Sequence, residues 1–310
     1  MSSTPVDLVG VGLNATDTLI SISEFPAPGS KADVHSLSVM PGGQVATAVI
    51  ACQGWGLRTR YIGKLGDDAA AETHRQAFIA AGVETQITTV ANCSSAQSHI
   101  IVDAQGERSV LWHRDPRLAI APEELKREWI TKARALLVDG CDTAPATQAA
   151  QWAREAGIPV VADLDDVYVK VEVLLENVDY LIVSRDFPAQ ISGKANLRES
   201  LPWLQQRFGS RLAAATLGTG GVLAWEGRTF YHSAAFRVSA IDTTGAGDVF
   251  HAGFIFGLLQ DWPLQRILDF ACAAAALNCT AAGARGKIAS VEEIKALMAT
   301  AQRYPTPQQA

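Results

Sequence analysis

The stretch Asp242–Phe250 reads Asp-Thr-Thr-Gly-Ala-Gly-Asp-Val-Phe, which places two glycines around an alanine, then an aspartate, then an apolar run that suits a helix. Small residues let the backbone approach a ligand closely and let several N–H groups point the same way. If a helix begins near Gly245, its free N–H groups and the positive end of its dipole face that point too. Such an arrangement stabilises an anion, typically a phosphate.

Asp248 falls in the first turn of this predicted helix. A carboxylate there is badly placed to bind phosphate, but it is well placed to accept a proton from an attacking hydroxyl. An anion cradle formed by Gly245, Ala246 and Gly247 beside one base is what phosphoryl transfer to an alcohol requires. Taken alone, the pattern also fits an ordinary turn followed by an aspartate that the helix dipole favours.

The composition is that of a soluble globular enzyme with a substantial core: 310 residues, 48% hydrophobic and 19% charged. A net charge of −6 without a long basic run disfavours a nucleic-acid partner. The N-terminal residues lack the pattern of an export signal, and apolar stretches such as 270–277 are too short to span a bilayer, so we expect no membrane partner. Five scattered cysteines without a CxxC motif favour reduced thiols in a cytoplasmic protein.

Apolar runs and periodicity organise the chain into alternating strands and helices, most regularly after Arg134. This alternation predicts an α/β fold with a mostly parallel sheet and helices on both faces, in one domain over residues 1–310. Two segments of polar alternation, at about 14–40 and 93–114, break the rhythm. We expect them to form a small separate β-sheet that acts as a lid, the second one as a hairpin closed by residues 103–106.

Two further places have residues suited to a polyhydroxylated ligand. Gly42 and Gly43 open a helix-like segment, where paired glycines allow close approach of a ligand or form a simple strand-to-helix turn. Asn14 and Asp17 follow the first predicted strand, and ligands of open α/β sheets bind at the carboxyl ends of strands. A carboxylate there accepts hydrogen bonds from two adjacent hydroxyls, or it forms an Asx turn.

These motifs resemble those of the ribokinase-like (PfkB) family of carbohydrate and nucleoside kinases. The Asp242–Phe250 string is similar to the second signature of that family, Pro41–Gly43 to the first, and Tyr61–Asp68 to a supporting run. The resemblance implies a ribokinase-like three-layer sandwich, ATP and Mg²⁺ as cofactors, and a homodimer formed through the lid. It also implies roles for single residues, with Asp248 as base, Gly245–Gly247 as anion hole, and Gly42, Gly43 and Asp17 as sugar ligands.

The same resemblance assigns a nucleotide loop to residues 216–221, which follow a predicted strand. In it Thr216, Gly218 and Gly221 approach the phosphates of ATP, while Asn278 borders the adenine. Asp242 and Thr244 resemble the monovalent-cation site of some members, which implies K⁺. One departure is Ser184-Arg185-Asp186-Phe187, where many members have an Asn-x-x-Glu motif that organises magnesium waters. Magnesium is therefore implied without a named protein ligand.

Several short stretches are most similar to the sulfofructose-kinase-like branch, namely Gly43–Ala48, Ser94–Ser98, Val102-Asp103 with Gly106-Glu107-Arg108, Val249–His251 and Cys279-Thr280. In this branch Thr47 takes the position of the usual asparagine. Lys31 matches a lysine with which that branch grips a sulfonate, but the positions of its other two anion ligands hold Trp112 and Cys141. Arg114 is either a substitute cationic grip or a solvated lid residue. His251, one turn after Asp248, is interpreted as a packing residue.

The sequence therefore predicts an ATP-dependent kinase of a sugar or sugar-like alcohol, with a fructose-like ketose favoured. A nucleoside kinase of the same fold is one alternative, although few aromatic residues fall in the lid to stack a base. A non-catalytic nucleotide- or sugar-binding sensor is another. A dinucleotide-dependent oxidoreductase is disfavoured because Gly10-Val11-Gly12 lacks the third glycine at the required spacing.

Overall fold

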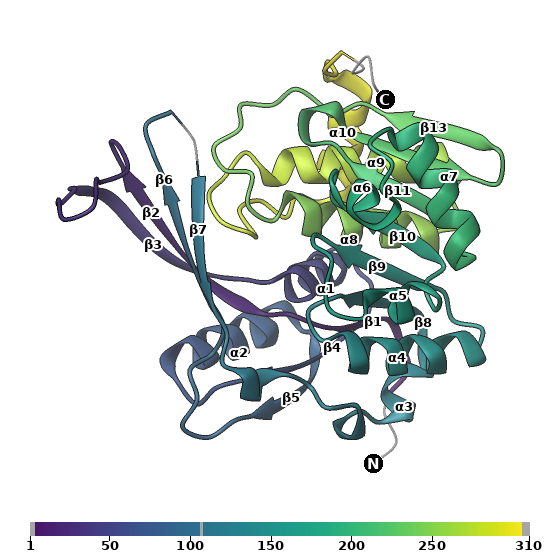
Figure 1. Cartoon of the computed structure of the whole chain (residues 1–310), viewed down its shortest axis with the longest axis horizontal. Coiled ribbons are helices and arrows are strands. Elements are labelled where there is room, and N and C mark those ends of the chain that lie inside the picture. The colour runs from purple at the N-terminus through teal and green to yellow at the C-terminus, as the bar shows by residue number, and fades with distance from the viewer. Residues whose placement is uncertain (1–3, 106–107, 306–310) are drawn as a thin grey trace.

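The protein is described by a computed structural model that covers residues 4–105 and 108–305 (Figure 1). Within these residues a nine-stranded sheet forms the centre of the molecule, in the order β13-β12-β11-β10-β9-β8-β1-β4-β5. All neighbouring pairs from β11 to β5 are parallel, while β12 and β13 add antiparallel strands at one edge. The strands are β1 Val6–Val11, β4 Thr59–Leu65, β5 Glu84–Thr89, β8 Ala133–Asp139, β9 Val160–Leu164, β10 Tyr180–Val183, β11 Leu212–Thr216, β12 Val222–Glu226 and β13 Thr229–Ser233.

Helices cover both faces of this sheet, which confirms the predicted α/β three-layer sandwich (Figure 1). The central strands are mostly apolar, which suits strands that are buried on both faces, and their polar residues fall at or near their ends. One face packs against α1 Gln44–Gly54, α2 Ala69–Ala81, α8 Ala246–Leu259, α9 Leu264–Asn278 and α10 Val291–Thr300. The other packs against α3 Arg127–Ile130, α4 Thr143–Glu155, α5 Val171–Leu175, α6 Phe187–Ser192 and α7 Leu197–Phe208. Short 3₁₀ helices occupy Pro116–Leu118, Pro122–Glu124 and Gly218–Gly220.

A second sheet projects from one side of the sandwich (Figure 1). In the described residues it has four strands in the order β3-β2-β6-β7, namely β2 Ala15–Ile22, β3 Val34–Gly42, β6 Gln97–Val102 and β7 Arg108–His113. Cross-strand pairing aligns Asp17 with Ser98 and Ser98 with Trp112, so these three side chains share one face. The pairing of Ile20 with Leu37 and of His99 with Leu111 places those residues on the opposite face.

The long strands and helices expected from periodicity are present, with ends that differ by a few residues. Part of the predicted 103–106 turn and its neighbour Glu107 lie outside the described residues. The short helices α3, α5 and α6 were not predicted, because four to six residues are too few to display a helical period. Helix α10 was also missed, although Ser290 and Glu293 form a capping box that marks its start. Among the described helices, none is both long and apolar enough to cross a membrane.

Candidate active site

A cavity of about 530 Å³ lies where the carboxyl ends of the parallel strands face the second sheet. Its wall includes Asp17 of β2 and Ser98 of β6 on the side of the second sheet. Asp163 and Thr216, from β9 and β11, line the sandwich side together with Asp248 of α8. The cavity therefore collects polar groups from segments that are far apart in the sequence, at the edge of an α/β sheet where ligands bind.

Helix α8 begins as the sequence predicts, with Gly245 as its N-cap residue and Asp248 in its first turn. Gly245 has a φ of +74°, and a Cβ there would collide with the carbonyl oxygen of Ala284, so a side chain is excluded. The N–H of Ala246 donates to the carbonyl of Thr243 at 3.2 Å. In the described chain the N–H groups of Gly247 and Asp248 have no backbone partner, which leaves them available to an anion at the cavity.

Asp248 lines the cavity, and its carboxylate forms no hydrogen bond within the described residues. The pKa of this group is raised to about 7, mainly by burial and also by the neighbouring carboxylate of Asp163, while His251 opposes the shift. A carboxyl group with this pKa is half ionised near neutral pH. It is therefore able to act as a base for a hydroxyl bound in the cavity.

Asp17 stands on the opposite wall, and the two glycines of the predicted sugar site lie next to it. Gly42 ends β3 against the carboxylate of Asp17, where a Cβ would collide with Oδ2. Gly43 is the N-cap of α1 with a φ of +91°, and it lines the cavity. Burial raises the pKa of Asp17 to about 6, against hydrogen bonding from Ser98 and the charge of Arg285. The structure thus brings Asp17, Gly43 and Asp248 to one cavity.

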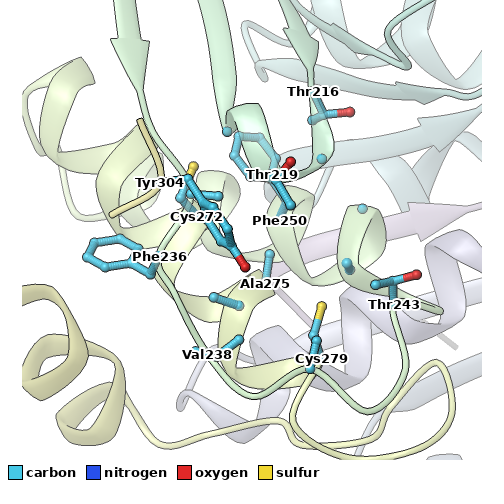
Figure 2. Close-up of a pocket in the computed structure, with 17 residues that line it drawn as sticks. Thr216, Thr219, Phe236, Val238, Thr243, Phe250, Cys272, Ala275, Cys279 and Tyr304 are labelled. Carbon is cyan, nitrogen blue, oxygen red and sulfur yellow. The ribbon is translucent and has the colours of Figure 1, made fainter. Parts of the chain in front are cut away.

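A second cavity extends from the first along the start of α8 (Figure 2). Thr216, Gly218 and Gly221 of the predicted nucleotide loop line it. In the view of Figure 2, Thr216 and Thr243 stand at one end and the rings of Phe236 and Tyr304 at the other. Its remaining apolar wall comes from the segment between β13 and α8, from α8 and from α9 with its C-cap residue, namely Val238, Ala240, Phe250, Cys272, Ala275, Ala276 and Cys279.

The two cavities meet at three residues that line both, Thr216, Thr243 and Gly247. The apolar end of the second cavity suits a flat base, and its polar end opens on the first turn of α8. A phosphate chain that ran from one cavity into the other would end at the free N–H groups beside Asp248. This continuity is the strongest geometric feature of the site.

Two asparagines predicted to touch ligands instead form internal hydrogen bonds. Nδ2 of Asn14 donates to the Tyr61 hydroxyl at 2.5 Å and to the Lys64 carbonyl at 3.0 Å, away from the residues that line the large cavity. Asn278 is fully buried and does not line the second cavity. Its side chain links the carbonyls of Thr244 and Ala284, which joins the loop before α8 to the loop after α9.

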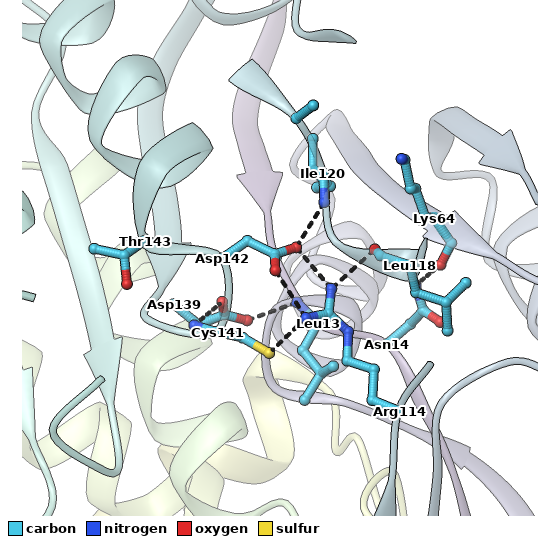
Figure 3. Close-up of polar contacts among 12 residues, drawn as sticks. Leu13, Asn14, Lys64, Arg114, Leu118, Ile120, Asp139, Cys141, Asp142 and Thr143 are labelled. Carbon is cyan, nitrogen blue, oxygen red and sulfur yellow. Dashed lines mark hydrogen bonds and ion pairs between the residues drawn. The ribbon is translucent and has the colours of Figure 1, made fainter. Parts of the chain in front are cut away.

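Neither cation predicted to grip an anionic substrate lines the cavity. Lys31 is exposed in the connection between β2 and β3. The guanidinium of Arg114 makes a bidentate ion pair with Asp142 at 2.8 and 2.7 Å and donates to the Leu118 carbonyl (Figure 3). Asp142 also accepts from the Ile120 N–H at 3.0 Å, so Arg114 fastens the chain after β7 to the start of α4.

Two functional candidates were missed by the sequence reasoning. Asp163 lies near the carboxyl end of β9 and Asp165 directly follows that strand; both line the cavity, and the strand-end rule that selected Asp17 also applies to them. Oδ2 of Asp163 is buried without a hydrogen bond in the described chain, 3.2 Å from Nδ1 of His251. His251, interpreted from the sequence as a packing residue, is buried, which lowers its pKa, but it also lines the cavity, and Nδ1 lies 2.8 Å from the Gly247 carbonyl oxygen.

The residues present fit magnesium in part and give no support for a monovalent cation at Asp242. Asp165 and Asp166 present oxygen donors to the cavity, and Mg²⁺ commonly takes one or two carboxylates together with phosphate and water. No group of three ligating side chains exists among the described residues. Asp242 accepts hydrogen bonds from the N–H and hydroxyl of Thr244 and from the Gly283 N–H, so both of its oxygens are engaged in closing the loop.

Comparisons with known proteins show which family the chain resembles and which solved structures share its fold. The family model of the pfkB family carbohydrate kinases matches residues 8–290. The chain is 28% identical over 279 residues to an ATP-dependent ribose-1-phosphate kinase of Halopiger xanaduensis, covering 87% of this chain and 90% of that one. It is 25% identical over 298 residues to a 5-dehydro-2-deoxygluconokinase of Geobacillus kaustophilus, covering 88% of each. A solved ribokinase from Thermotoga maritima has the same fold, with a TM-score of 0.83 at 21% identity over 95% of this chain and 100% of that one.

Proposed function

The chain belongs to the pfkB family of carbohydrate kinases, and we propose that it transfers the γ-phosphoryl group of ATP to a sugar hydroxyl that Asp248 deprotonates. Sugar kinases among its relatives support ATP-dependent phosphorylation of a small sugar. The observation that carries the assignment of residues is the junction of the two cavities at Thr216, Thr243 and Gly247. Nucleotide and sugar would meet there, beside the base.

In the proposed reaction the sugar lies between Asp17, Gly43 and Asp248, with one hydroxyl toward Asp248. The bond from that oxygen to phosphorus forms as the bond from phosphorus to the β–γ bridging oxygen breaks, and ADP leaves. The hydroxyl proton passes to the carboxylate of Asp248. An alcohol is far less acidic than a carboxyl group with a pKa of about 7, so the proton moves late and Asp248 orients the hydroxyl before that.

Charge on the transferred phosphoryl group would be stabilised by the unpaired N–H groups of Gly247 and Asp248 and by the positive end of the α8 dipole. Gly245 allows the tight turn that aims them. Asp165 and Asp166 would hold Mg²⁺ beside the phosphates. When bound, the metal neutralises phosphate charge. K⁺ is not part of the proposal, because Asp242 accepts hydrogen bonds from Thr244 with one oxygen and from the Gly283 N–H with the other.

The sugar class is less constrained than the reaction. Asp17 and the backbone at Gly43 suit vicinal hydroxyls of a ketose or aldose. Sulfofructose is not proposed, because Lys31 is exposed and Trp112 and Cys141 line the cavity where that branch has anion ligands. Trp112 does favour one second candidate, a nucleoside, since this aromatic residue lines the cavity and could stack on a base.

The second sheet is proposed to act as the lid of this site and as the surface of a homodimer. Asp17, Ser98 and Trp112 on its inner face line the cavity, so a movement of the sheet would exclude water from the reaction. We place the enzyme in the cytoplasm, where ATP is available and where its five free cysteines remain reduced.

An assay of ATP consumption across ketoses, aldoses, sugar phosphates, sugar acids and nucleosides tests the proposal with the variant Asp248→Asn. We expect kcat to fall about 10²- to 10⁴-fold, because a general base is lost. Stabilisation of the protein by ATP in a thermal shift should persist. The control is Asp261→Asn at the other end of α8, where φ is +53° and asparagine is tolerated. Undiminished turnover by purified Asp248→Asn would falsify the assignment.

A further inference from the structure

Arg285 reaches from the loop between α9 and α10 to the beginning of α1. Its Nη2 donates to the carbonyl of Gly42 at 3.1 Å, and its Nε donates to the hydroxyl of Thr47 at 3.4 Å. Thr47 is fully buried in the first turns of α1. The guanidinium thus fastens the loop after α9 to the glycine turn that faces the proposed sugar site.

The large cavity has an excess of acidic side chains. Asp17, Asp163, Asp165, Asp166 and Asp248 line it, and neither lysine nor arginine does so in the described part of the chain. Arg285 lies behind this wall and interacts electrostatically with both Asp17 and Asp248. Burial lowers its pKa to about 10, so it stays positively charged at neutral pH.

Other titratable groups around this cation do not replace its charge. Tyr61 of β4 and His74 of α2 also interact with it, as does the wall residue Asp17 of β2. Burial lowers the pKa of His74 to about 3, so this ring is neutral near pH 7. Burial raises the pKa of Tyr61, which is neutral too. Asp242, before α8, adds a further negative charge near Asp17.

We propose that Arg285 is a positioning residue of the proposed sugar kinase, which compensates the negative charge of Asp17 and Asp248 and holds the Gly42–Gly43 turn in place for the sugar. The inference rests on the proposed function of the site. Without the cation, two carboxylates would face each other across the cavity with their charges uncompensated. Protonation of Asp17 would remove a hydrogen-bond acceptor from the sugar site.

The first experiment compares Arg285→Met, Arg285→Lys and wild type by kcat/KM for the sugar between pH 5 and 9. An opposite charge nearby lowers a carboxyl pKa by about 1–3 units. We expect the acidic limb of Arg285→Met to move up by about one pH unit and its sugar KM at pH 7 to rise about tenfold. Arg285→Lys should restore most of both, and the ATP KM should stay within about twofold.

Lys287→Met is the matched control, because Lys287 lies in the same loop and its ammonium pairs with Glu293 at the surface. It should leave the pH profile in place. An equal loss of activity at every pH in Arg285→Met, with an unmoved limb, would assign Arg285 a purely structural role and overturn the proposal.

A second readout needs no turnover, so it separates this inference from the assignment of kinase activity. The ¹³Cγ resonance of Asp17, identified with Asp17→Asn, is titrated in ligand-free wild type, Arg285→Met and Arg285→Lys. The pKa of Asp17, about 6 in the wild type, should rise in Arg285→Met and return to the wild-type value in Arg285→Lys. A pKa that is the same in all three proteins contradicts the inference, whatever sugar the enzyme uses.

Discussion

Asp248 occupies surroundings that favour its protonated form, although the proposed chemistry needs its ionised form. Burial raises its pKa to about 7, and Asp163 and Asp17 add like charge. The N–H groups of the first helical turn and the helix dipole act in the opposite direction. The compromise is a base that is about half ionised at neutral pH and that retains enough proton affinity to accept a hydroxyl proton.

The pH dependence of kcat/KM follows from these shifts. Asp248 must be ionised to accept a proton, and its raised pKa means that ionisation is lost as the pH falls through about 7. Asp17 must be ionised to accept hydrogen bonds from the sugar, and its raised pKa means that this ionised form is lost as the pH falls through about 6. We expect the slope of log kcat/KM to approach about 2 at acid pH and about 1 in Asp17→Asn. A single limb near pH 4 in the wild type would show that neither group controls the reaction.

Substitution of Asp248 should cost activity without costing stability. A carboxyl group whose folded pKa is raised above its unfolded value is destabilising when ionised, and this penalty is present above pH 7 and disappears below the unfolded pKa. Asp248→Asn removes it. The melting temperature of the variant at pH 8 should therefore equal or exceed that of the wild type, as measured by calorimetry. A lower melting temperature would mean that the carboxylate stabilises the fold, contrary to its raised pKa.

At the level of elements, the start of α8 performs two separable tasks through two neighbouring glycines. Gly245 makes the turn, since its φ of +74° and the nearby carbonyl of Ala284 exclude a side chain. Gly247 is helical and has open space around the position of a Cβ, while it lines both cavities. The first glycine therefore serves the fold, and the second serves access to the N–H groups.

Paired alanine substitutions separate these tasks. Gly245→Ala should destabilise the protein by about 1–3 kcal/mol, because alanine disfavours this backbone region. Gly247→Ala should leave stability unchanged or raise it by up to about 1 kcal/mol, because alanine suits a helix better than glycine. Its methyl group would nevertheless stand at the cavity junction and lower kcat about 10- to 100-fold. Denaturant unfolding and steady-state kinetics measure both. Equal destabilisation by the two variants would contradict the assignment of Gly245 to the fold and of Gly247 to access to the N–H groups.

The parts of the site that could be predicted are those formed by residues that are consecutive in the sequence. Gly245 to Asp248 form one string, so their shared location at a helix start could be inferred from spacing. Arg285 and Phe236 reach the site from distant segments, and no local period marks them. Asn14 illustrates the converse limit of sequence reasoning, since its position at a strand end was visible but its hydrogen bond to Tyr61 depends on tertiary packing.

For the whole molecule, the alternation of strands and helices was sufficient to predict the sandwich and its parallel sheet. The two polar-alternating segments likewise formed the second sheet, since period-two patterning survives wherever one face is exposed. The alternating pattern could not predict which face of the second sheet lines the cavity. The cross-strand register decides it, by placing Asp17, Ser98 and Trp112 together.

The same register leaves an apolar outer face on the second sheet that a monomer would expose to water. Leu37, Val39 and Leu111 lie on it, 60%, 57% and 58% exposed. Burying one such side chain contributes about 1.5–3 kcal/mol to stability. In a symmetric dimer the same surface of both subunits forms the interface, so each of these residues would contribute twice. The proposed homodimer would cover this face and hold two lids together.

Leu37→Glu should therefore dissociate the dimer, because a carboxylate in an apolar interface is costly to desolvate. Light scattering should give about twice 33.0 kDa for the wild type and about 33.0 kDa for the variant at micromolar concentration. Ile79→Glu is the control, since Ile79 is 69% exposed on α2, outside the second sheet. It should remain dimeric. A monomeric wild type would rule out the dimer, and a Leu37→Glu variant that stays dimeric would place the interface on another surface. In either case the apolar outer face would need another partner.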